Sequence, residues 1–237
     1  MVKKEIFVTS PNPLSPKIKL SGDGSHTLFV PELDEHYHST RGAVQEALYV
    51  YIERGLRAFG ELSKGLQPLV TVAEIGFGTG LNALLTAIDA IEHNRTVQYV
   101  SYEKFPLPAE IVAQLNYTHF VAPQHALLFE KIHNAPWNER VEITPQFSLH
   151  KIQTDITQQV PEIPCNVIYY DAFAPGKQAE MWSESVLRRV CAHLQPGGIF
   201  VTYCAQGHVR RTLKAIGLQV ERLPGPPGKW EMLQGRK

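Results

Sequence analysis

The segment from Leu69 to Ile88 constrains the fold more than any other part of the sequence. An apolar run leads into Glu74, glycine follows at three alternate positions, and a helix-like pattern begins at Leu81. Glycine allows turns with positive φ and lets a ligand approach the main chain closely, and the first turn of a helix has free N–H groups. The segment predicts a buried strand, a tight turn and a helix. Such a unit suits a nucleotide-like cofactor at the carboxyl ends of a parallel sheet.

The spacing of the glycines indicates the kind of cofactor. A dinucleotide site reads G-x-G-x-x-G and places a pyrophosphate on the helix N-terminus, whereas Gly76, Gly78 and Gly80 read G-x-G-x-G and follow Glu74. A carboxylate would repel a pyrophosphate and attract a cationic or amino-bearing ligand. S-adenosylmethionine has a sulfonium and an amino group and no phosphate, and the pattern resembles the first motif of the Rossmann-like methyltransferases. A purely structural glycine turn would read the same way.

Composition limits the classes to which the chain can belong. Its 237 residues are 43% hydrophobic and 19% charged, which is ordinary for a globular protein. We expect an N-terminal extension over residues 1–65 and a methyltransferase domain over residues 66–237. The sequence has neither a run long enough for a membrane helix nor a signal core, which predicts a cytoplasmic protein without membrane contact. The three cysteines form no C-x-x-C pair, so neither disulfides nor a metal is expected.

Three further predicted strands end at a carboxylate: Glu103, Asp155 and Asp171. Because the carboxyl ends of parallel strands face the ligand, Glu103 is predicted to hold the ribose and Asp155 the adenine amino group. The alternatives are a solvated Glu103 and an Asp155 that caps the following residues. Asp171 precedes an apolar-aromatic loop, Ala172 to Pro175, which indicates a functional site.

The remaining segments of the chain complete the expected fold. A turn signal at residues 21–25 between two strand-like segments predicts a β-hairpin, and helical spacing runs from Ala43 to Leu56. Residues 104–146 read as mostly helical, and two late strands suit an antiparallel sheet end. We expect an α/β, Rossmann-like class I methyltransferase fold. It would have a seven-stranded, mostly parallel sheet with an N-terminal hairpin and helix extension.

Four segments together resemble the methyltransferase domain of the MnmC-type tRNA wobble-uridine enzymes, which also occurs as stand-alone MnmD-type proteins. The resemblance spans about residues 20–235, and the Asp-Ala-Phe-Ala-Pro segment with the tail makes it specific. The loops at 176–180 and 225–230 depart from the family pattern. These departures concern residues expected to contact the substrate more than those expected to bind the cofactor. The four segments are residues 37–46, 74–82, 171–182 and 202–233.

The resemblance implies methyl transfer from S-adenosylmethionine to the amine of 5-aminomethyl(-2-thio)uridine at the tRNA wobble position. The product would be 5-methylaminomethyl(-2-thio)uridine. Asp171 would be the catalytic carboxylate, because such a group can orient an amine and accept its proton, and it would also contact the cofactor. The other cofactor-binding residues would be Glu74, Gly76, Phe77, Gly78, Thr79, Gly80, Asn82, Glu103 and Asp155.

The implied partners are tRNA and an upstream enzyme that forms the aminomethyl uridine. Phe173 and Tyr203 would stack on a flipped-out base, with core packing as the alternative for each. Because bifunctional relatives continue into a flavin-dependent oxidase domain and this chain stops at Lys237, no flavin is expected. The substrate-binding residues would be Tyr37, His38, Phe173, Lys177, Tyr203, Arg210, Arg211 and Lys229.

Three other functions fit parts of the sequence. A small-molecule amine methyltransferase of the same fold agrees with the net charge of zero, since fold alone does not fix the substrate. The basic group at Arg210 and Arg211 favours RNA instead. A nicotinamide oxidoreductase is disfavoured by the glycine spacing, and a non-enzymatic RNA-binding module is disfavoured by Asp171 and its loop.

Overall fold

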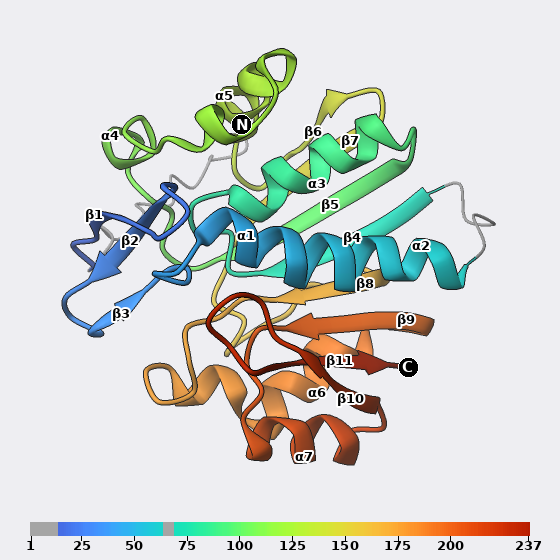
Figure 1. Ribbon diagram of the computed structural model, residues 1–237. Coiled ribbons are helices and arrows are strands. Elements are labelled where there is room, and N and C mark those ends of the chain that lie inside the picture. Colours follow the sequence, from blue (N-terminus) through green and yellow to red (C-terminus); the bar gives the residue numbers. More distant parts are fainter. Residues whose placement is uncertain (1–13, 64–68) are drawn as a thin grey trace, which may run out of the picture.

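An eight-stranded sheet organises the molecule, for which the computed structural model describes residues 14–63 and 69–237 (Figure 1). The strand order is β10-β11-β9-β8-β4-β5-β7-β6, and the five strands from β9 to β7 are mutually parallel. The expected mostly parallel α/β fold is therefore confirmed. The strands are β4 (Leu69–Ile75), β5 (Thr96–Glu103), β6 (Arg140–Thr144), β7 (Phe147–Gln153), β8 (Cys165–Tyr170), β9 (Leu194–Thr202), β10 (Gln219–Pro224) and β11 (Glu231–Arg236).

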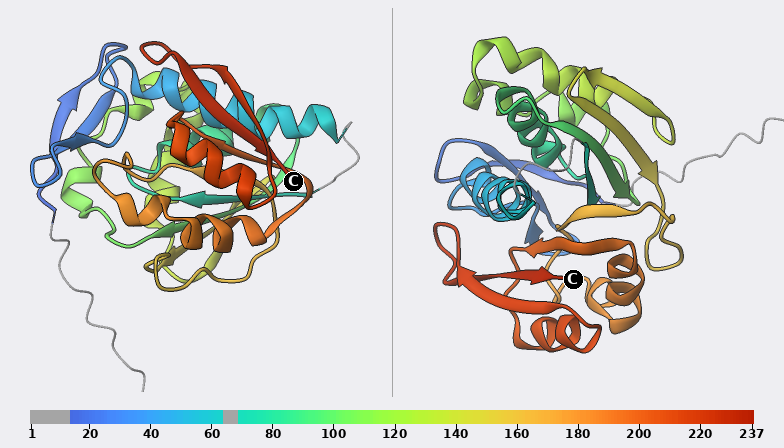
Figure 2. Two further views of the ribbon diagram at one scale, coloured as in Figure 1. Left: turned by 90° about the horizontal axis from the view of Figure 1, so that it is seen from below. Right: turned by 90° about the vertical axis from the view of Figure 1, so that its right-hand side faces the viewer.

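Helices cover both faces of the sheet, as the right-hand view of Figure 2 shows. On one face lie α3 and a continuous helix formed by α1, the π-helix η1 and α2, and on the other face lie α6 and α7. Short helical segments join the remaining strands. The helices are α1 (Ala43–Ala47), η1 (Leu48–Arg57), α2 (Ala58–Leu62), α3 (Leu81–Glu92), α4 (Ala109–Val112), η2 (Tyr117–Phe120), η3 (Pro123–His125), α5 (Ala126–Asn134), η4 (Ala179–Trp182), α6 (Glu184–Ala192) and α7 (Gly207–Ala215).

The core consists of two apolar layers, because successive side chains of a strand point to opposite faces. In β8, Val167 and Tyr169 pack in the layer with η1 and α3. Ile168 and Tyr170 pack in the layer with α6 and α7. Strand β8 is therefore buried on both faces, as its apolar sequence requires.

A small N-terminal sheet precedes the long helix. Its strands β1 (Lys17–Leu20) and β2 (His26–Val30) pair antiparallel, and β3 (Glu35–His36) adds to β2. The predicted hairpin is confirmed. The small sheet lies beyond the carboxyl edge of the large one, near the start of α1 (Figure 1).

The large sheet has eight strands where seven were expected. The additional strand is β6, which lies within the stretch predicted to be mostly helical and pairs antiparallel with β7. Its sequence, Arg-Val-Glu-Ile-Thr, alternates polar and apolar residues over only five positions. A pattern this short is easily hidden by the helical residues that precede it.

The predicted boundary between residues 65 and 66 falls in the segment 64–68, which lies outside the described residues, so the division into two units stays a prediction. Helix η1 packs against α3, β8 and β9. Within residues 14–63 and 69–237, we find no helix with the length and apolar character needed to cross a bilayer.

Candidate active site

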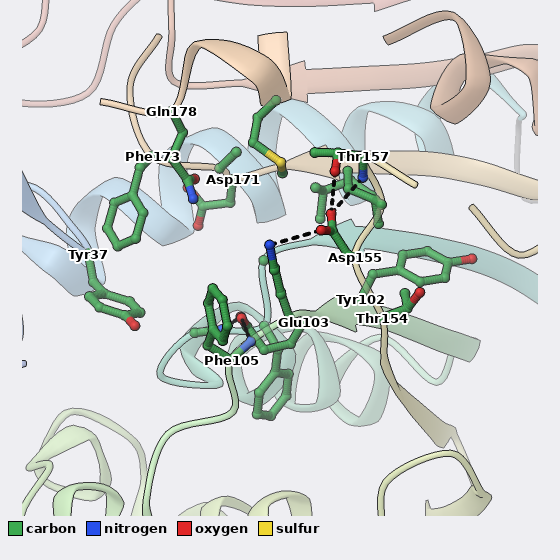
Figure 3. A pocket seen from close by; sticks show the side chains of 18 of the residues that line it. Tyr37, Tyr102, Glu103, Phe105, Thr154, Asp155, Thr157, Asp171, Phe173 and Gln178 are labelled. Carbon is green, nitrogen blue, oxygen red and sulfur yellow. Dashed lines mark hydrogen bonds and ion pairs between the residues drawn. The ribbon is translucent and has the colours of Figure 1, made fainter. Parts of the chain in front are cut away.

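A pocket opens at the carboxyl edge of the sheet, where β4, β5, β7 and β8 end (Figure 3). Side chains from these strand ends form its floor, and residues from the loops after β3 and β8 form its walls. This is the edge where ligands bind in open parallel sheets. Of the residues predicted to form the site, those that line the pocket are Tyr37, His38, Gly76, Phe77, Gly78, Asn82, Glu103, Asp155, Asp171 and Phe173.

The glycine turn between β4 and α3 requires its glycines for two reasons. Gly76 and Gly78 have φ values of 91° and 51°, which side chains rarely adopt. A Cβ atom at Gly76 would lie 2.9 Å from the carbonyl oxygen of Asp171, and one at Gly78 would lie 3.0 Å from the Tyr37 ring. The turn therefore brings bare backbone against the pocket between β4 and β8.

Glu103, at the end of β5, is held by the main chain. Its Oε2 accepts a hydrogen bond from the Gly78 N–H (3.1 Å) and its Oε1 one from the Phe105 N–H (2.8 Å). Burial raises the pKa of this carboxyl. The carboxylate keeps a lone pair for a ligand hydroxyl, so Glu103 is a fixed acceptor beside the glycine turn.

Asp155 follows β7 and faces the same pocket. Its Oδ1 accepts hydrogen bonds from the N–H (2.9 Å) and hydroxyl (2.6 Å) of Thr157, and its Oδ2 pairs with Lys104 Nζ at 2.9 Å. Burial acts to raise the pKa of Asp155, but the bonds from Thr157 and Lys104 outweigh it and lower the pKa. The side chain thus orders a turn as well as lining the pocket, and no helix follows it for which it would be a cap.

Asp171, at the end of β8, has a partner on each carboxylate oxygen. The Tyr51 hydroxyl donates to Oδ1 (2.6 Å) and the Asn82 amide donates to Oδ2 (2.9 Å). Burial raises the pKa of Asp171 to about 6, although the bond from Tyr51 acts to lower it. At neutral pH the group is therefore mostly a carboxylate, held in place by η1 and α3, and it can take up a proton more readily than an exposed aspartate.

Aromatic rings form the wall next to the glycine turn. Tyr37 and Phe173 meet edge to face, with centroids 5.0 Å apart and an interplanar angle of 81°, and Phe173 lies between Tyr37 and Asp171 in Figure 3. His38 lies next to them, with Nε2 3.5 Å from the Thr79 hydroxyl. Burial lowers the pKa of His38 to about 4, so this imidazole is neutral at physiological pH.

Three residues predicted to bind the cofactor are not part of the pocket lining. Glu74 is fully buried and accepts a hydrogen bond from the Ser101 hydroxyl (2.5 Å). Burial raises its pKa to about 8, so it carries little charge at neutral pH and does not itself attract a cationic ligand. Thr79 is bonded to Tyr117, and Gly80 is the left-handed residue before α3.

Five residues predicted to bind the substrate lie outside the pocket lining. Lys177 pairs with Asp34 (3.3 Å) and Lys229 with Glu46. The Tyr203 hydroxyl donates to the Ala172 carbonyl (2.9 Å), and Lys229 covers its ring. The others, Arg210 and Arg211, lie in the first turns of α7.

Sequence reasoning missed several residues of the site. Tyr51 follows the helical spacing of apolar residues, which indicates only a helix face, and nothing in the sequence links it to Asp171. The pocket lining also includes Tyr102, Lys104, Phe105, Thr154, Gln178 and Met181. Of these residues, Thr154 could have been predicted from the sequence, because it precedes Asp155 at the end of the same strand.

The donors and acceptors of the pocket fit S-adenosylmethionine. Asn82 Oδ1 and His38 Nδ1 are buried and have no hydrogen-bond partner within the described part of the chain. The amide oxygen of Asn82 can accept from the amino group of a ligand. Lys104, the cation of the lining, is already paired with Asp155, which disfavours a pyrophosphate. Among the described residues, no cluster of His, Cys, Asp or Glu side chains could hold a metal ion.

Comparison with known proteins agrees with this fit. Residues 121–237 match a family described as S-adenosyl-L-methionine-dependent methyltransferase. The tRNA 5-methylaminomethyl-2-thiouridine biosynthesis bifunctional protein MnmC of Cupriavidus necator is 33% identical, over 86% of this chain and 32% of that protein. Its namesake in Actinobacillus pleuropneumoniae is 30% identical, over 92% of this chain and 35% of that protein. The chain thus spans about a third of the length of these curated relatives.

A solved structure gives independent support for the fold. The crystal structure of MnmC2 from Aquifex aeolicus matches with a TM-score of 0.72 and 24% identity, and the match covers 96% of this chain and 72% of that one. The match to the Actinobacillus protein covers 92% of the chain and so extends well beyond residues 121–237. The chain therefore belongs to the S-adenosyl-L-methionine-dependent methyltransferase family and corresponds to the methyltransferase part of the bifunctional MnmC proteins.

Proposed function

We propose that this enzyme methylates the amine of 5-aminomethyl(-2-thio)uridine at the wobble position of tRNA and forms 5-methylaminomethyl(-2-thio)uridine. The names of the MnmC relatives place them in the biosynthesis of this nucleoside. The observation that carries the proposal is the position of Asp171. It is an oriented carboxylate that lines the same pocket as the aromatic pair of Tyr37 and Phe173.

The cofactor would lie along the strand ends. Glu103 would accept hydrogen bonds from the ribose hydroxyls, and residues around Asp155 would surround the adenine. The free Oδ1 of Asn82 would accept from the amino group of the methionine part. Gly76 and Gly78 would let that part pass close to the backbone.

S-adenosylmethionine, when bound, supplies a methyl group on a positively charged sulfur, and the reaction replaces this carbon–sulfur bond by a carbon–nitrogen bond. Asp171 has two tasks in this step. It accepts hydrogen bonds from the substrate amine and so orients the nitrogen lone pair, and it receives the proton that the amine loses as the new bond forms. Positioning of this kind contributes roughly 7 to 11 kcal/mol in favourable cases.

The walls of the pocket would hold the base and keep water away from the amine. Phe173 presents an aromatic surface next to Asp171, and Tyr37 supports it edge to face. A base turned out of the anticodon loop would stack there, as single-stranded RNA bases do on aromatic side chains. For Tyr203, one face is already covered by Lys229, so stacking on this ring would require its other face.

Labelled S-adenosylmethionine tests the proposal directly. The protein is incubated with tRNA that carries the aminomethyl group and with the same tRNA without it. We expect label in the first RNA only, and nucleoside analysis should identify the methylaminomethyl product. Label in neither RNA, together with methylation of free amines, would contradict the proposal.

A small-molecule amine methyltransferase is the second candidate, and one observation favours it. Two of the cations predicted to contact RNA, Lys177 and Lys229, are neutralised by Asp34 and Glu46. Competition between aminomethyl tRNA and the free aminomethyl nucleoside separates the two functions. A tRNA enzyme should prefer the tRNA by orders of magnitude, because phosphate contacts supply much of the affinity for a nucleic acid.

Two further predictions belong to the same proposal. An upstream enzyme has to supply the aminomethyl group, because the proposed reaction only adds a methyl to it. A cytoplasmic location would place the enzyme with its tRNA.

A further inference from the structure

Trp230, in the loop between β10 and β11, is almost completely exposed, at 97%. Trp182, in contrast, is 2% exposed and donates its indole N–H to the Phe173 carbonyl. Exposure of so large an apolar side chain is unfavourable, although single exposed apolar residues are common. The exposure of Trp230 alone therefore does not indicate a binding site, and the structure of its loop has to be considered.

The loop between β10 and β11 is held in place by contacts with α1 and η1. Lys229 pairs with Glu46 of α1 and lies 3.9 Å from the centroid of the Tyr203 ring. The Tyr49 hydroxyl of η1 donates to the Pro224 carbonyl (2.9 Å). The loop is also closed internally, since the Gly225 N–H donates to the Trp230 carbonyl (3.0 Å). Trp230 is thus presented to solvent by a well-anchored turn.

The side chain of Arg41 packs against the same loop. Gly228 has a φ of 89°, and a Cβ atom there would come within 1.9 Å of Arg41 Cδ, so the Arg41 side chain occupies the space that only glycine leaves. Arg41 is exposed, and in the described part of the chain it forms no ion pair. An aromatic face and an unpaired guanidinium therefore share one surface, which we call the Trp230 surface.

The Trp230 surface lies at the same edge of the sheet as the pocket. Strand β11 runs antiparallel to β9, so the loop before β11 lies at the carboxyl edge of the sheet, beside α1 (Figure 1). Lys229 connects the loop to Tyr203, and the hydroxyl of Tyr203 bonds the carbonyl of Ala172, next to Asp171. A substrate larger than the pocket would extend over this loop.

We propose that the Trp230 surface docks the anticodon stem-loop of tRNA, with the indole stacked on an unpaired base near the target uridine and Arg41 on a backbone phosphate. This inference rests on the function proposed above. When the target base leaves its stack, a neighbouring base loses its stacking partner. An exposed indole can stack on that base whatever its identity. A guanidinium is suited to phosphate by its geometry and its permanent charge.

The test compares Trp230→Ala and Trp230→Phe with the wild type in binding and methylation of aminomethyl tRNA. Stacking predicts that Trp230→Ala weakens tRNA binding and raises KM for tRNA by about 5- to 150-fold. The value of kcat and the affinity for S-adenosylhomocysteine should not change, and Trp230→Phe should retain most of the affinity. Because stacking involves no charge, Trp230→Ala should keep the salt slope of binding, whereas Arg41→Gln should reduce it by about one.

Leu127→Ala is the matched control, because Leu127 is 67% exposed and lies on α5, which packs on β6 at the opposite end of the sheet. It should behave as wild type. If Trp230→Ala binds and methylates tRNA like the wild type, the docking surface is wrong while the proposed function stands. The docking surface is equally wrong if Trp230→Ala changes only the oligomeric state. If the wild type binds no tRNA at all, the proposed function fails as well.

Discussion

The hydroxyl of Tyr51 donates a 2.6 Å hydrogen bond to Oδ1 of Asp171 and so connects the N-terminal helix to the carboxylate at the end of β8. Tyr51 is 1% exposed and lies in the π-helix η1. Helical segments of this kind are rare and frequently occur at functional sites. Under the proposed function, Tyr51 is a positioning residue that acts through Asp171.

Replacement of Tyr51 by phenylalanine tests this role. A hydrogen bond to a charged group contributes about 1.5 to 3 kcal/mol, so we expect turnover to fall about 10-fold or more while S-adenosylhomocysteine binds normally. The bond stabilises the carboxylate and lowers its pKa. Its loss should therefore raise the pKa of Asp171 and move the acid limb of the pH–rate profile to higher pH. A purely structural role would lower thermal stability without moving that limb.

The glycine turn gives a second prediction, for cofactor binding. Gly78→Asp should abolish binding of S-adenosylhomocysteine in a calorimetric titration, because a side chain there meets the Tyr37 ring at 3.0 Å. Gly197→Asp is the matched control, since Gly197 also has positive φ (77°) and no atom lies within 4 Å of its added Cβ. Equal effects of the two variants would indicate backbone strain and not occupation of the pocket.

Glu103 gives a third prediction. Glu103→Ala should weaken S-adenosylhomocysteine binding by roughly 1.5 to 3 kcal/mol, the usual contribution of a hydrogen bond to a charged group. The exposed Glu142 of β6 offers a control, Glu142→Ala, that should leave the affinity as it is. An unchanged dissociation constant for Glu103→Ala would remove Glu103 from the ribose site.

The parts of the site that the sequence predicted are those governed by local rules. Alternate glycines after an apolar run indicate a turn with positive φ, and Gly76 and Gly78 have this conformation. Carboxylates at strand ends meet at one edge of a parallel sheet, and Glu103, Asp155 and Asp171 all reach the pocket. In each case the residue type and its place in the strand determine where the side chain lies.

The parts that the sequence did not predict depend on partners far along the chain. Tyr51 reaches a residue 120 positions away. Lys151 is 1% exposed in β7 and donates to the carbonyls of Ile132 and His133, a burial that an alternating strand pattern does not reveal. The charge of Glu74 was also overestimated, because burial raises its pKa and burial depends on the assembled sheet.

The pH dependence of the wild type provides a fourth prediction. Burial raises the pKa of Asp171 to about 6, so the single-turnover rate should fall as the pH decreases through about 6 and the carboxylate becomes protonated. Protonation of the substrate amine adds a separate dependence at higher pH. Asp171→Asn should lose the limb near pH 6 and keep the other one. A limb near pH 6 that persists in the Asn variant would have to come from another group.

Single-turnover methylation of aminomethyl tRNA by Asp171→Asn, at saturating S-adenosylmethionine, tests the central claim most directly. Asparagine keeps the size of the side chain and one acceptor oxygen but cannot take up the proton of the amine. We expect nearly normal binding of S-adenosylmethionine and a rate lower by about 10²-fold or more, within the range for acid–base groups. A rate close to that of the wild type would show that Asp171 only orders its loop and would contradict the proposed mechanism.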